Sequence, residues 1–599
     1  MTTARVRCLT GLGLLLMLVS GLDGPGLRAV AQTPAPPAAQ AWIAESNRHS
    51  QVLLDIFARF APESAGQFGV SGLDEDVTIL SDERVQARRA AVEAALAKLQ
   101  DALAVETNPP VRQDLEILIR SARNALRGIQ LAEERQVPYV DVATVVFSGV
   151  RSLLDPQVPA GRRRSAVVRL RKYAGLLPGH DPISTQAIRR TRARLGDPGL
   201  LPPVRSQVER DLGNLPLLVR GIEELLGQYE LEGWREPFGV LSGQLSAYEQ
   251  FVRTELLPKS RTDFRLPADL YAFSLEQVGV GMAPEALAAS ARQAFTGIQA
   301  EMQQLAPRVA ATRGLNTSDY RDVIRALKKE QLVGGAILPH YRARLRDLEA
   351  IIRKEGLVTL PQREARIRIA TDAEAAQSPA PNMRPPRMLG NTGEMGEFIL
   401  PLNIPAAPGA PQAGQQYDDF TFEAASWTLT AHEARPGHEM QFAKIIETGV
   451  SVARALFAFN STNVEGWALY AEWMMLPYMP SDGQLISLQF RLLRAARAFL
   501  DPELHMGRVT PDEARRLLRE DVVLSEAMTT QEVERYMFRA PAQATSYFYG
   551  YTRLLELRPE IERALGERFN AREFHDAVLA QGLLPPELLN EAVRRQLVR

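Results

Sequence analysis

The sequence predicts a mainly α-helical protein: a large helical array with one small β-sheet next to a candidate metal-site helix. Long stretches such as 82–106 and 283–306 repeat apolar residues three and four positions apart, which is the period of a helix. Clusters of Pro and Gly separate these stretches and predict short turns. Two segments, 365–371 and 396–404, instead have the composition and alternation of strands.

The first 31 residues predict an export signal. Two arginines precede an apolar run that ends at Asp23, and the small residues "AVA" before Gln32 suit a cleavage site. The run is shorter than the roughly 20 apolar residues of a membrane span, so we expect no stable membrane insertion after cleavage. Cys8 precedes the run, is badly placed for lipid attachment, and would be lost with the signal. A chain without cysteines suits an oxidising compartment, so we expect a periplasmic or secreted protein.

The mature chain is predicted to have two parts that need not be independent domains. A Pro/Ala linker, 32–40, precedes an N-terminal helical half, 41–265, and a C-terminal catalytic half, 266–599. The 70 basic and 71 acidic residues leave a net charge of -1, so no overall field favours a nucleic-acid partner. The basic run 161–172 lacks interleaved aromatic residues, and we interpret it as the solvated side of an amphipathic helix.

The two strand segments lie just upstream of the candidate metal-site helix. A loop rich in Pro and Gly separates 365–371 from 396–404. If an edge of this sheet lies beside the metal, it could bind an extended peptide through main-chain hydrogen bonds. The alternative is a plain structural hairpin, and the sequence leaves both interpretations open.

The segment "TAHEARPGHEMQF", 430–442, carries two candidate metal ligands. His432 and His438 are six positions apart, whereas the helical H-E-x-x-H signature places its histidines four apart. On an ideal helix, six positions turn about 240° and rise about 9 Å, too far for one ion at about 2.0–2.1 Å from each donor. Pro436 and Gly437 interrupt the helix, so the extra residues can form a bulge that returns His438 beside His432. The alternative is an ordinary break between two unrelated helices.

A third ligand is expected from the segment "EGWALYAE", 465–472. A catalytic zinc site needs three protein ligands and one open position. Glu465 and Glu472 share one helix face, and we expect Glu465 to bind the metal and Glu472 to support the site from behind. The alternative for Glu465 is a helix-start carboxylate favoured by the dipole. Glu433, beside the first ligand, is placed to take a proton from the metal-activated water.

Three blocks, "HEARPGHEMQ", "EGWALYAE" and "VERYMFRAPAQATSYFYG", resemble in order the signature blocks of the bacterial family catalogued as domain of unknown function 885. Typical blocks of that family read HEAxPGHHxQ, EGWAxYxE and RYxxxPGQAxSYxxG. The segment 60–83 also resembles the start of the family, so the resemblance spans essentially the whole mature chain. Because the family resembles helical zinc peptidases, it implies a gluzincin-like helical metallopeptidase architecture and one Zn²⁺ ion. It implies that His432, His438 and Glu465 are the metal ligands and that Glu433 is the general base.

The resemblance also implies roles further along the chain. His505 stands where the family has a D-x-G-x-H-type segment, and its C-terminal block is matched by Arg535, Gln543 and Tyr547. Tyr547 or His505 could donate a hydrogen bond to the oxyanion of a tetrahedral intermediate. Arg535 could clamp a substrate carboxylate with two hydrogen bonds, and Gln543 is a substrate-binding candidate. The alternatives are a packed aromatic ring for Tyr547 and, for Arg535, a buried ion pair with Glu532 or Glu534.

Three departures separate this sequence from the family pattern. Glu439 replaces the second histidine of the HH pair, Ala542 replaces the glycine of PGQA, and Pro502 and Glu503 stand where a glycine is usual. If position 439 were a ligand, a carboxylate in place of an imidazole would change the preferred metal. Ala542 would narrow or reshape the substrate wall.

We therefore expect an exported zinc-dependent hydrolase, a metallopeptidase that cleaves peptide bonds of short peptides, with Glu433 as general base. One alternative is a degenerate relative, a non-catalytic periplasmic protein that binds metal or peptide. The other is a metal-dependent hydrolase of a non-peptide amide or ester. A peptide substrate is the expected partner, and the sequence leaves the oligomeric state open.

Overall fold

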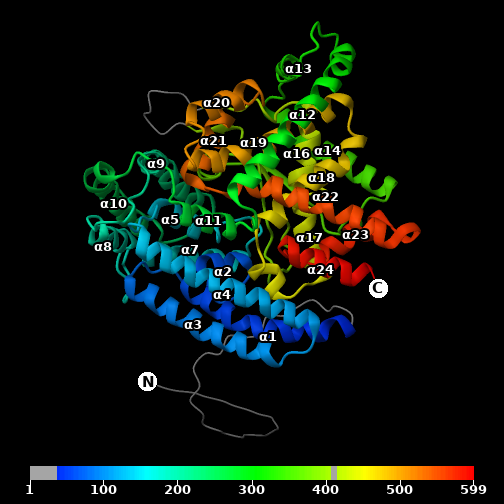
Figure 1. Cartoon of the computed structure of the whole chain (residues 1–599). Coiled ribbons are helices and arrows are strands. Elements are labelled where there is room, and N and C mark those ends of the chain that lie inside the picture. The colour runs from blue at the N-terminus through cyan, green and yellow to red at the C-terminus, as the bar shows by residue number, and fades with distance from the viewer. Residues whose placement is uncertain (1–36, 406–414, 599) are drawn as a thin grey trace, which may run out of the picture.

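The computed structural model describes residues 37–405 and 415–598, and the predicted signal segment 1–31 lies outside them. The chain is mainly α-helical with a small sheet, as predicted (Figure 1). The first helix begins at Pro37, so the last four residues of the predicted linker 32–40 are helical. Within the described residues, no helix has the length and apolar character needed to cross a bilayer.

Ten α-helices build the described part of the N-terminal half. In Figure 1, α1, α3 and α4 lie side by side along one border of the molecule. Ser81 caps the start of α3, accepting a hydrogen bond from the N–H of Arg84 at 3.2 Å. The bounds are α1 Pro37–Phe60, α2 Pro62–Phe68, α3 Asp82–Val105, α4 Pro109–Arg135, α5 Val142–Arg151, α6 Ala160–Arg163, α7 Ser165–Tyr173, α8 Ile183–Arg194, α9 Arg205–Gln228 and α10 Arg235–Phe251.

The C-terminal half is built around two long helices, α12 and α19, which pack along one another. Their contact forms the centre of the largest apolar core, and α16 packs against α19 and α18. The bounds are α11 Ala268–Gln277, α12 Pro284–Arg313, α13 Tyr320–Leu327, α14 Ile337–Glu355, α15 Asp372–Gln377, α16 Glu423–Glu433, α17 His438–Thr448, α18 Ser461–Met475, α19 Ser481–His505, α20 Pro511–Glu520, α21 Glu526–Glu534, α22 Ser546–Leu565, α23 Ala571–Leu579 and α24 Pro586–Leu597.

In the part of the chain that the structure describes, three short π-helices and a few 3₁₀ turns join these elements. The π-helices cover Val252–Leu256, Ala453–Phe457 and Arg535–Arg539. The last of them lies in the block that carries the candidate substrate-binding residues. Such i to i+5 turns are common at functional sites, and no apolar period in the sequence predicts them.

The predicted strands are confirmed, but not as a hairpin. β1 (Arg366–Ile369) runs parallel to β3 (Glu397–Leu400), while β2 (Asn382–Arg384) pairs antiparallel on the other side, giving the order β1-β3-β2. A parallel pair needs a crossover connection, and α15 together with β2 supplies it here. A separate pair, β4 (Asn403–Ile404) with β5 (Gln415–Gln416), follows.

The basic run 161–172 is less solvated than we expected. It divides between α6 and α7, and Arg169 is only 1 % exposed. The guanidinium of Arg169 donates to the carbonyl oxygens of Gly149 and Leu73. Arg162 forms two 2.7 Å hydrogen bonds with Asp74. These arginines therefore join N-terminal elements to one another instead of forming a solvated face.

The helices α18 and α22 cross at a very short distance next to the candidate site. A Cβ added at Gly466 would lie 2.6 Å from the backbone of Gly550, and one added at Gly550 would lie 1.9 Å from the carbonyl oxygen of Thr462. Only glycine allows two helices to approach so closely. Because Glu465 precedes Gly466 and Tyr547 lies one turn before Gly550, the crossing brings both functional candidates to one place.

Candidate metal centre

His432 lies near the end of α16, and its ring is oriented by a carboxylate. Nδ1 is 2.7 Å from Oε1 of Glu472, so Nδ1 carries the proton and Nε2 is left with its lone pair. Glu472 also accepts a hydrogen bond from Thr428 and lies 3.3 Å from a guanidinium nitrogen of Arg494. The expected position of Glu472 behind the first histidine is therefore observed.

The Pro-Gly pair breaks the helix and does not form a bulge within it. α16 ends at Glu433 and α17 begins at His438, yet the rings of His432 and His438 lie 4.7 Å apart, centre to centre. A Cβ at Gly437 would lie 1.9 Å from the carbonyl oxygen of His432, so glycine is required by the close approach of the chain. The indole N–H of Trp467 donates to the carbonyl oxygen of Pro436 at 2.9 Å and holds the turn.

Glu465 completes a three-residue group. It stands in the second turn of α18, which begins at Ser461, so it is not a helix-start carboxylate. Its Oε2 lies 3.2 Å from Nε2 of His438 and 3.6 Å from Nε2 of His432. Tetrahedral coordination with bonds of about 2.0–2.1 Å separates neighbouring ligand atoms by about 3.3 Å. One donor atom from each residue lies within 4.8 Å of the others, so the group has the dimensions of a zinc site.

Unpartnered buried atoms support the same interpretation. Among the described residues, Oε2 of Glu433, Nδ1 of His438 and Oε2 of Glu465 have no hydrogen-bond partner. Buried polar atoms normally have one. A divalent cation would provide it for Oε2 of Glu465, and a water molecule bound to that cation would provide it for Oε2 of Glu433; Nδ1 of His438 is not the nitrogen that faces Glu465. Two imidazoles and one carboxylate also match a common ligand set of catalytic zinc. The residues present fit a zinc ion.

Glu433 lies beside the three candidate ligands, and its surroundings disfavour the ionised form of its carboxyl group. The pKa of Glu433 is raised to about 8, chiefly by burial and also by the carboxylates of Glu465 and Glu472, while His438 and Arg494 act to lower it. A divalent cation in the group would lower that pKa again. The carboxylate is thus placed to take up a proton beside the three candidate ligands.

Tyr547 adjoins the group on another side. Its ring lies parallel to that of His432, with centres 6.1 Å apart, and its hydroxyl accepts a 2.9 Å hydrogen bond from Arg535. Since that bond uses only a lone pair of the oxygen, the hydroxyl proton is free to be donated. Burial raises the pKa of Tyr547, which keeps it protonated.

Gln543 and Arg535 are held together in a polar chain. The Nε of Arg535 donates to Oε1 of Gln543 at 2.9 Å, while the amide of Gln543 donates to Ser461 at 2.8 Å and lies 3.4 Å from Oε1 of Glu465. The Nε edge of Arg535 is therefore already occupied, and its remaining Nη1 lies 3.8 Å from Glu532. Arg535 therefore does not present two free N–H groups to a substrate carboxylate. The predicted alternative, an ion pair with Glu532, is observed at this longer distance.

His505 makes its hydrogen bonds elsewhere. Its Nδ1 accepts from the N–H of Leu266 at 3.1 Å, and its Nε2 lies 2.9 Å from the carbonyl oxygen of Tyr536. Burial lowers the pKa of His505 to about 4, so the ring is neutral. With both nitrogens bonded to backbone, His505 has no free donor for an oxyanion, which favours a structural role.

The three departures from the family pattern are accommodated away from the ligands. Oε2 of Glu439 pairs with Nε of Arg435 at 2.7 Å, so its carboxylate is neutralised by an arginine and is not one of the three candidate ligands. Glu503 forms a forked ion pair with Arg292 of α12. Ala542 has a left-handed backbone with φ 71°, the conformation for which glycine is suited.

An arginine row on α19 is the part of the site that sequence reasoning missed. Arg494 supports Glu472, and Arg497 forms two hydrogen bonds with Glu532 while its guanidinium lies 4.5 Å from the ring centre of Tyr547. The signal was present in "RLLRAAR", where three arginines spaced three apart interrupt an otherwise apolar helix. Such a row predicts buried cations with specific partners.

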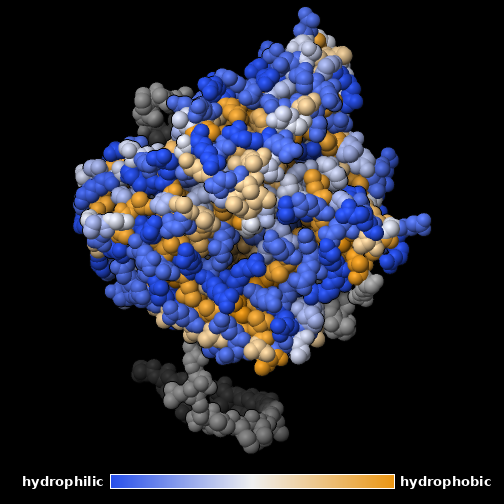
Figure 2. Space-filling view, viewed as in Figure 1, coloured by the Kyte–Doolittle hydropathy of each residue, from blue (hydrophilic) through white to orange (hydrophobic). Residues whose placement is uncertain are grey.

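A cavity of about 1080 Å³ lies between the two halves. Its wall includes Phe273 and Gln277 of α11 and also Met537, Phe538 and Pro541, which follow Arg535 in the chain. The three candidate ligands do not line it. Figure 2 shows that the face viewed in Figure 1 is hollowed near its middle, with apolar residues around the hollow.

Comparisons with known proteins identify similar chains. The model of a family described as "Bacterial protein of unknown function (DUF885)" matches residues 62–593. A crystal structure of a "putative lipoprotein" from Colwellia psychrerythraea superimposes with a TM-score of 0.74 at 19% identity, covering 93% of this chain and 99% of that one. A "putative lipoprotein of unknown function" from Shewanella oneidensis gives a TM-score of 0.68 at 19% identity, with coverage of 92% and 99%. Among curated proteins, no match is found.

Proposed function

This chain belongs to the bacterial DUF885 family, and on that premise we propose that it is a zinc-dependent hydrolase that cleaves peptide bonds of short peptides. The observation that carries the proposal is the convergence of His432, His438 and Glu465, whose donor atoms lie within 4.8 Å of one another. Beside them, the buried Oε2 of Glu433 has no hydrogen-bond partner. The gluzincin-like character of the architecture is part of this proposal.

A zinc ion held by His432, His438 and Glu465 would supply a Lewis acid and lower the pKa of a water molecule beside Glu433. Glu433 takes the proton of the attacking water and passes it to the leaving amine. Glu472 keeps the proton of His432 on Nδ1, which leaves Nε2 available as a ligand.

Tyr547 acts on the oxygen of the scissile carbonyl. As that oxygen becomes negative, the Tyr547 hydroxyl donates a hydrogen bond to it. Arg535 donates to the oxygen of the Tyr547 hydroxyl and thereby directs the proton of Tyr547 toward the substrate. Gln543 fixes Arg535 and lies close to Glu465, so these residues position groups of the site and do not themselves react.

The test is replacement of Glu433 with Gln, assayed by digestion of a peptide library with mass-spectrometric detection, with and without a chelator. We expect at least about a hundredfold loss of turnover, since a general base contributes about 10²–10⁴-fold. Elemental analysis should still find one zinc per chain. Glu423→Gln is the matched control, because Glu423 lies on the same helix with a side chain 61% exposed. Retained turnover in Glu433→Gln would contradict the proposed role of Glu433 as general base.

The same measurements distinguish the alternatives. A folded wild-type protein that holds zinc or peptide without turnover is the non-catalytic binding protein. Chelator-sensitive hydrolysis of amides or esters, with no cleavage of peptides, identifies a hydrolase of non-peptide substrates. We also propose export to the periplasm or medium through segment 1–31, which is checked by the N-terminal mass of the protein recovered from each fraction.

A further inference from the structure

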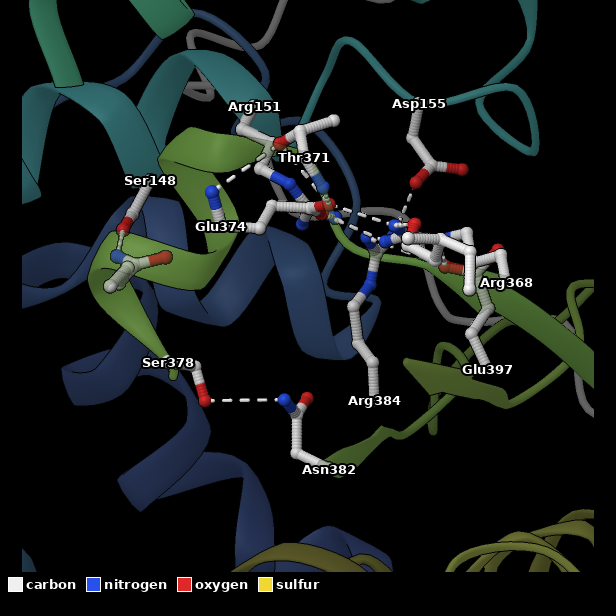
Figure 3. A network of polar contacts seen from close by, with 12 residues as sticks. Ser148, Arg151, Asp155, Arg368, Thr371, Glu374, Ser378, Asn382, Arg384 and Glu397 are labelled. Carbon is white, nitrogen blue, oxygen red and sulfur yellow. Dashed lines mark hydrogen bonds and ion pairs between the residues drawn. The ribbon is translucent and has the colours of Figure 1, made fainter. Parts of the chain in front are cut away.

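A buried ion-pair network joins the two halves across the polar face of the small sheet (Figure 3). Glu397 of β3, only 1 % exposed, lies 3.1 Å from Arg368, 3.4 Å from Arg366 and 3.7 Å from Arg384. Arg384 in turn donates to Asp155, which follows α5, at 2.7 Å. The network therefore connects the sheet of the C-terminal half to the N-terminal helices.

Cations outnumber anions in this network. Three carboxylates belong to it: Asp155, Glu374 and Glu397. Four arginines face them: Arg151, Arg366, Arg368 and Arg384. One guanidinium is therefore in excess. The pKa of Arg151 is lowered to about 9, chiefly by burial and also by Arg384 and Arg368, while Asp155 and Glu397 act to raise it. The surroundings of Arg151 thus carry uncompensated positive charge, which a further anion would stabilise.

A cavity of about 120 Å³ opens beside the network. It lies between the end of α5 and the segment 384–395, and its charged wall residues are Arg151, Asp155, Arg162, Arg384, Arg387 and Glu394. Arg162 is paired with Asp74 outside the cavity, and Arg387 lies 3.3 Å from Glu394. These two pairs are balanced, so the excess of one positive charge remains.

Two guanidinium nitrogens at this cavity lack a hydrogen-bond acceptor. Within the described ranges, Nη1 of Arg384 and Nε of Arg387 are buried without a partner. An unsatisfied buried donor on a charged group is costly. The cavity has room for a single oxyanion.

We propose that this cavity binds a small oxyanion, a phosphate or a carboxylate group, between Arg384 and Arg387. Guanidinium groups recognise both oxyanions through paired N–H donors. The bound group would lie among the guanidinium groups of the wall and neutralise the excess charge near Arg151. Because the wall comes from both halves, the anion would also hold the N-terminal helices against the sheet.

The test is calorimetric titration of the full mature protein with inorganic phosphate and, separately, with acetate, at constant ionic strength set by sodium chloride. We expect saturable binding with a dissociation constant of about 1 mM or below, equivalent to about −4 kcal/mol. Binding of phosphate alone identifies a tetrahedral oxyanion, and binding of acetate alone identifies a carboxylate. Either result supports binding in this cavity only if a variant of the cavity wall weakens binding and a control variant elsewhere does not.

Arg387→Gln should weaken binding at least about tenfold, because it removes a guanidinium group from the cavity wall. Arg89→Gln is the matched control: it removes one positive charge from a partly buried ion pair with Glu133, but Arg89 belongs neither to the network nor to the cavity wall, so we expect a change of less than about threefold. The shift of the melting temperature by phosphate gives a second readout, with far-UV circular dichroism checking the fold. Equal weakening by both variants, or no saturable heat with either anion, would overturn the proposal.

Discussion

Two buried histidines of the C-terminal half have opposite surroundings. At His432, Nδ1 bonds to a carboxylate and Nε2 faces Glu465. At His505, both nitrogens bond to backbone groups of Leu266 and Tyr536. Both rings are almost completely buried, so burial does not distinguish them. The carboxylate behind one nitrogen and a free lone pair on the other are what mark a candidate ligand.

The largest expected effect follows directly from this comparison. His432→Ala removes one of three candidate ligands, and we expect zinc affinity to fall more than about a hundredfold, beyond the 10–100-fold that supporting residues typically contribute. Zinc content is measured by elemental analysis after dialysis against a weak chelator. A variant that still holds one zinc per chain would contradict the ligand assignment.

His505→Ala is the matched change at the other histidine. It should leave zinc content unchanged and lower the free energy of unfolding by about 2–4 kcal/mol, because two buried backbone groups lose their partners. Urea denaturation of the metal-free protein measures the loss. If His505→Ala lost zinc with its stability intact, the two histidines would not differ as their contacts indicate.

The second effect concerns Asp501, which lies one turn before His505. Burial raises the pKa of Asp501 to about 7, while hydrogen bonds from the Ala542 N–H and the Tyr271 hydroxyl lower it. Between about pH 4 and pH 7 the unfolded chain releases this proton and the folded chain keeps it, so stability falls as the pH rises through that window. Asp501→Asn should flatten this fall by up to a few kcal/mol.

Urea denaturation at several pH values from 4.5 to 8 checks the expectation, with each midpoint compared between wild type and Asp501→Asn. The difference should grow from pH 4.5 to about pH 7 and then stay constant. Parallel stability curves would show that Asp501 titrates near its ordinary value.

The third effect tests the carboxylate behind His432. Glu472→Gln keeps the shape of the side chain but removes its charge, and zinc affinity should fall about 10–100-fold. A competition titration against a chelator of known affinity measures the change. Glu503→Gln, a buried glutamate that pairs with Arg292, is the control and should leave zinc affinity unaltered. Equal losses in both variants would make the role of Glu472 merely structural.

The smallest effect concerns Ala542. The left-handed backbone of Ala542 costs an L-residue about 1–2 kcal/mol. Glycine avoids this cost but loses about 0.5–1 kcal/mol more than alanine in conformational entropy on folding. Ala542→Gly should therefore stabilise the protein by about 0.5–1 kcal/mol in urea denaturation. Ala544→Gly, two residues further in a 3₁₀ turn, should destabilise it; stabilisation by both would refute the argument from backbone conformation.

Much of the fold could be predicted because its signals are local. The apolar period of 82–106 corresponds to α3, and the alternation in 365–371 contains β1. The parallel pairing of β1 with β3 could not be predicted, because it depends on a crossover through α15 and the short β2. The π-helix Arg535–Arg539 leaves no periodic signal.

The candidate site could be predicted where its residues lie in short, recognisable sequence segments. His432, His438 and Glu465 do meet, although through a helix break at Pro436 and Gly437 in place of the expected bulge. Pairings between distant segments were not predictable. Leu266, which bonds to His505, is 239 positions away, and nothing in the local sequence identifies it.

The bond from Trp467 to Pro436 gives this protein an optical property. The indole is buried one residue after Gly466 and touches the turn that places His438. Any event that moves this turn changes the polarity around the indole and hence the wavelength of its emission. With the other four tryptophans replaced by phenylalanine, Trp467 alone would report such events by fluorescence, without an added label.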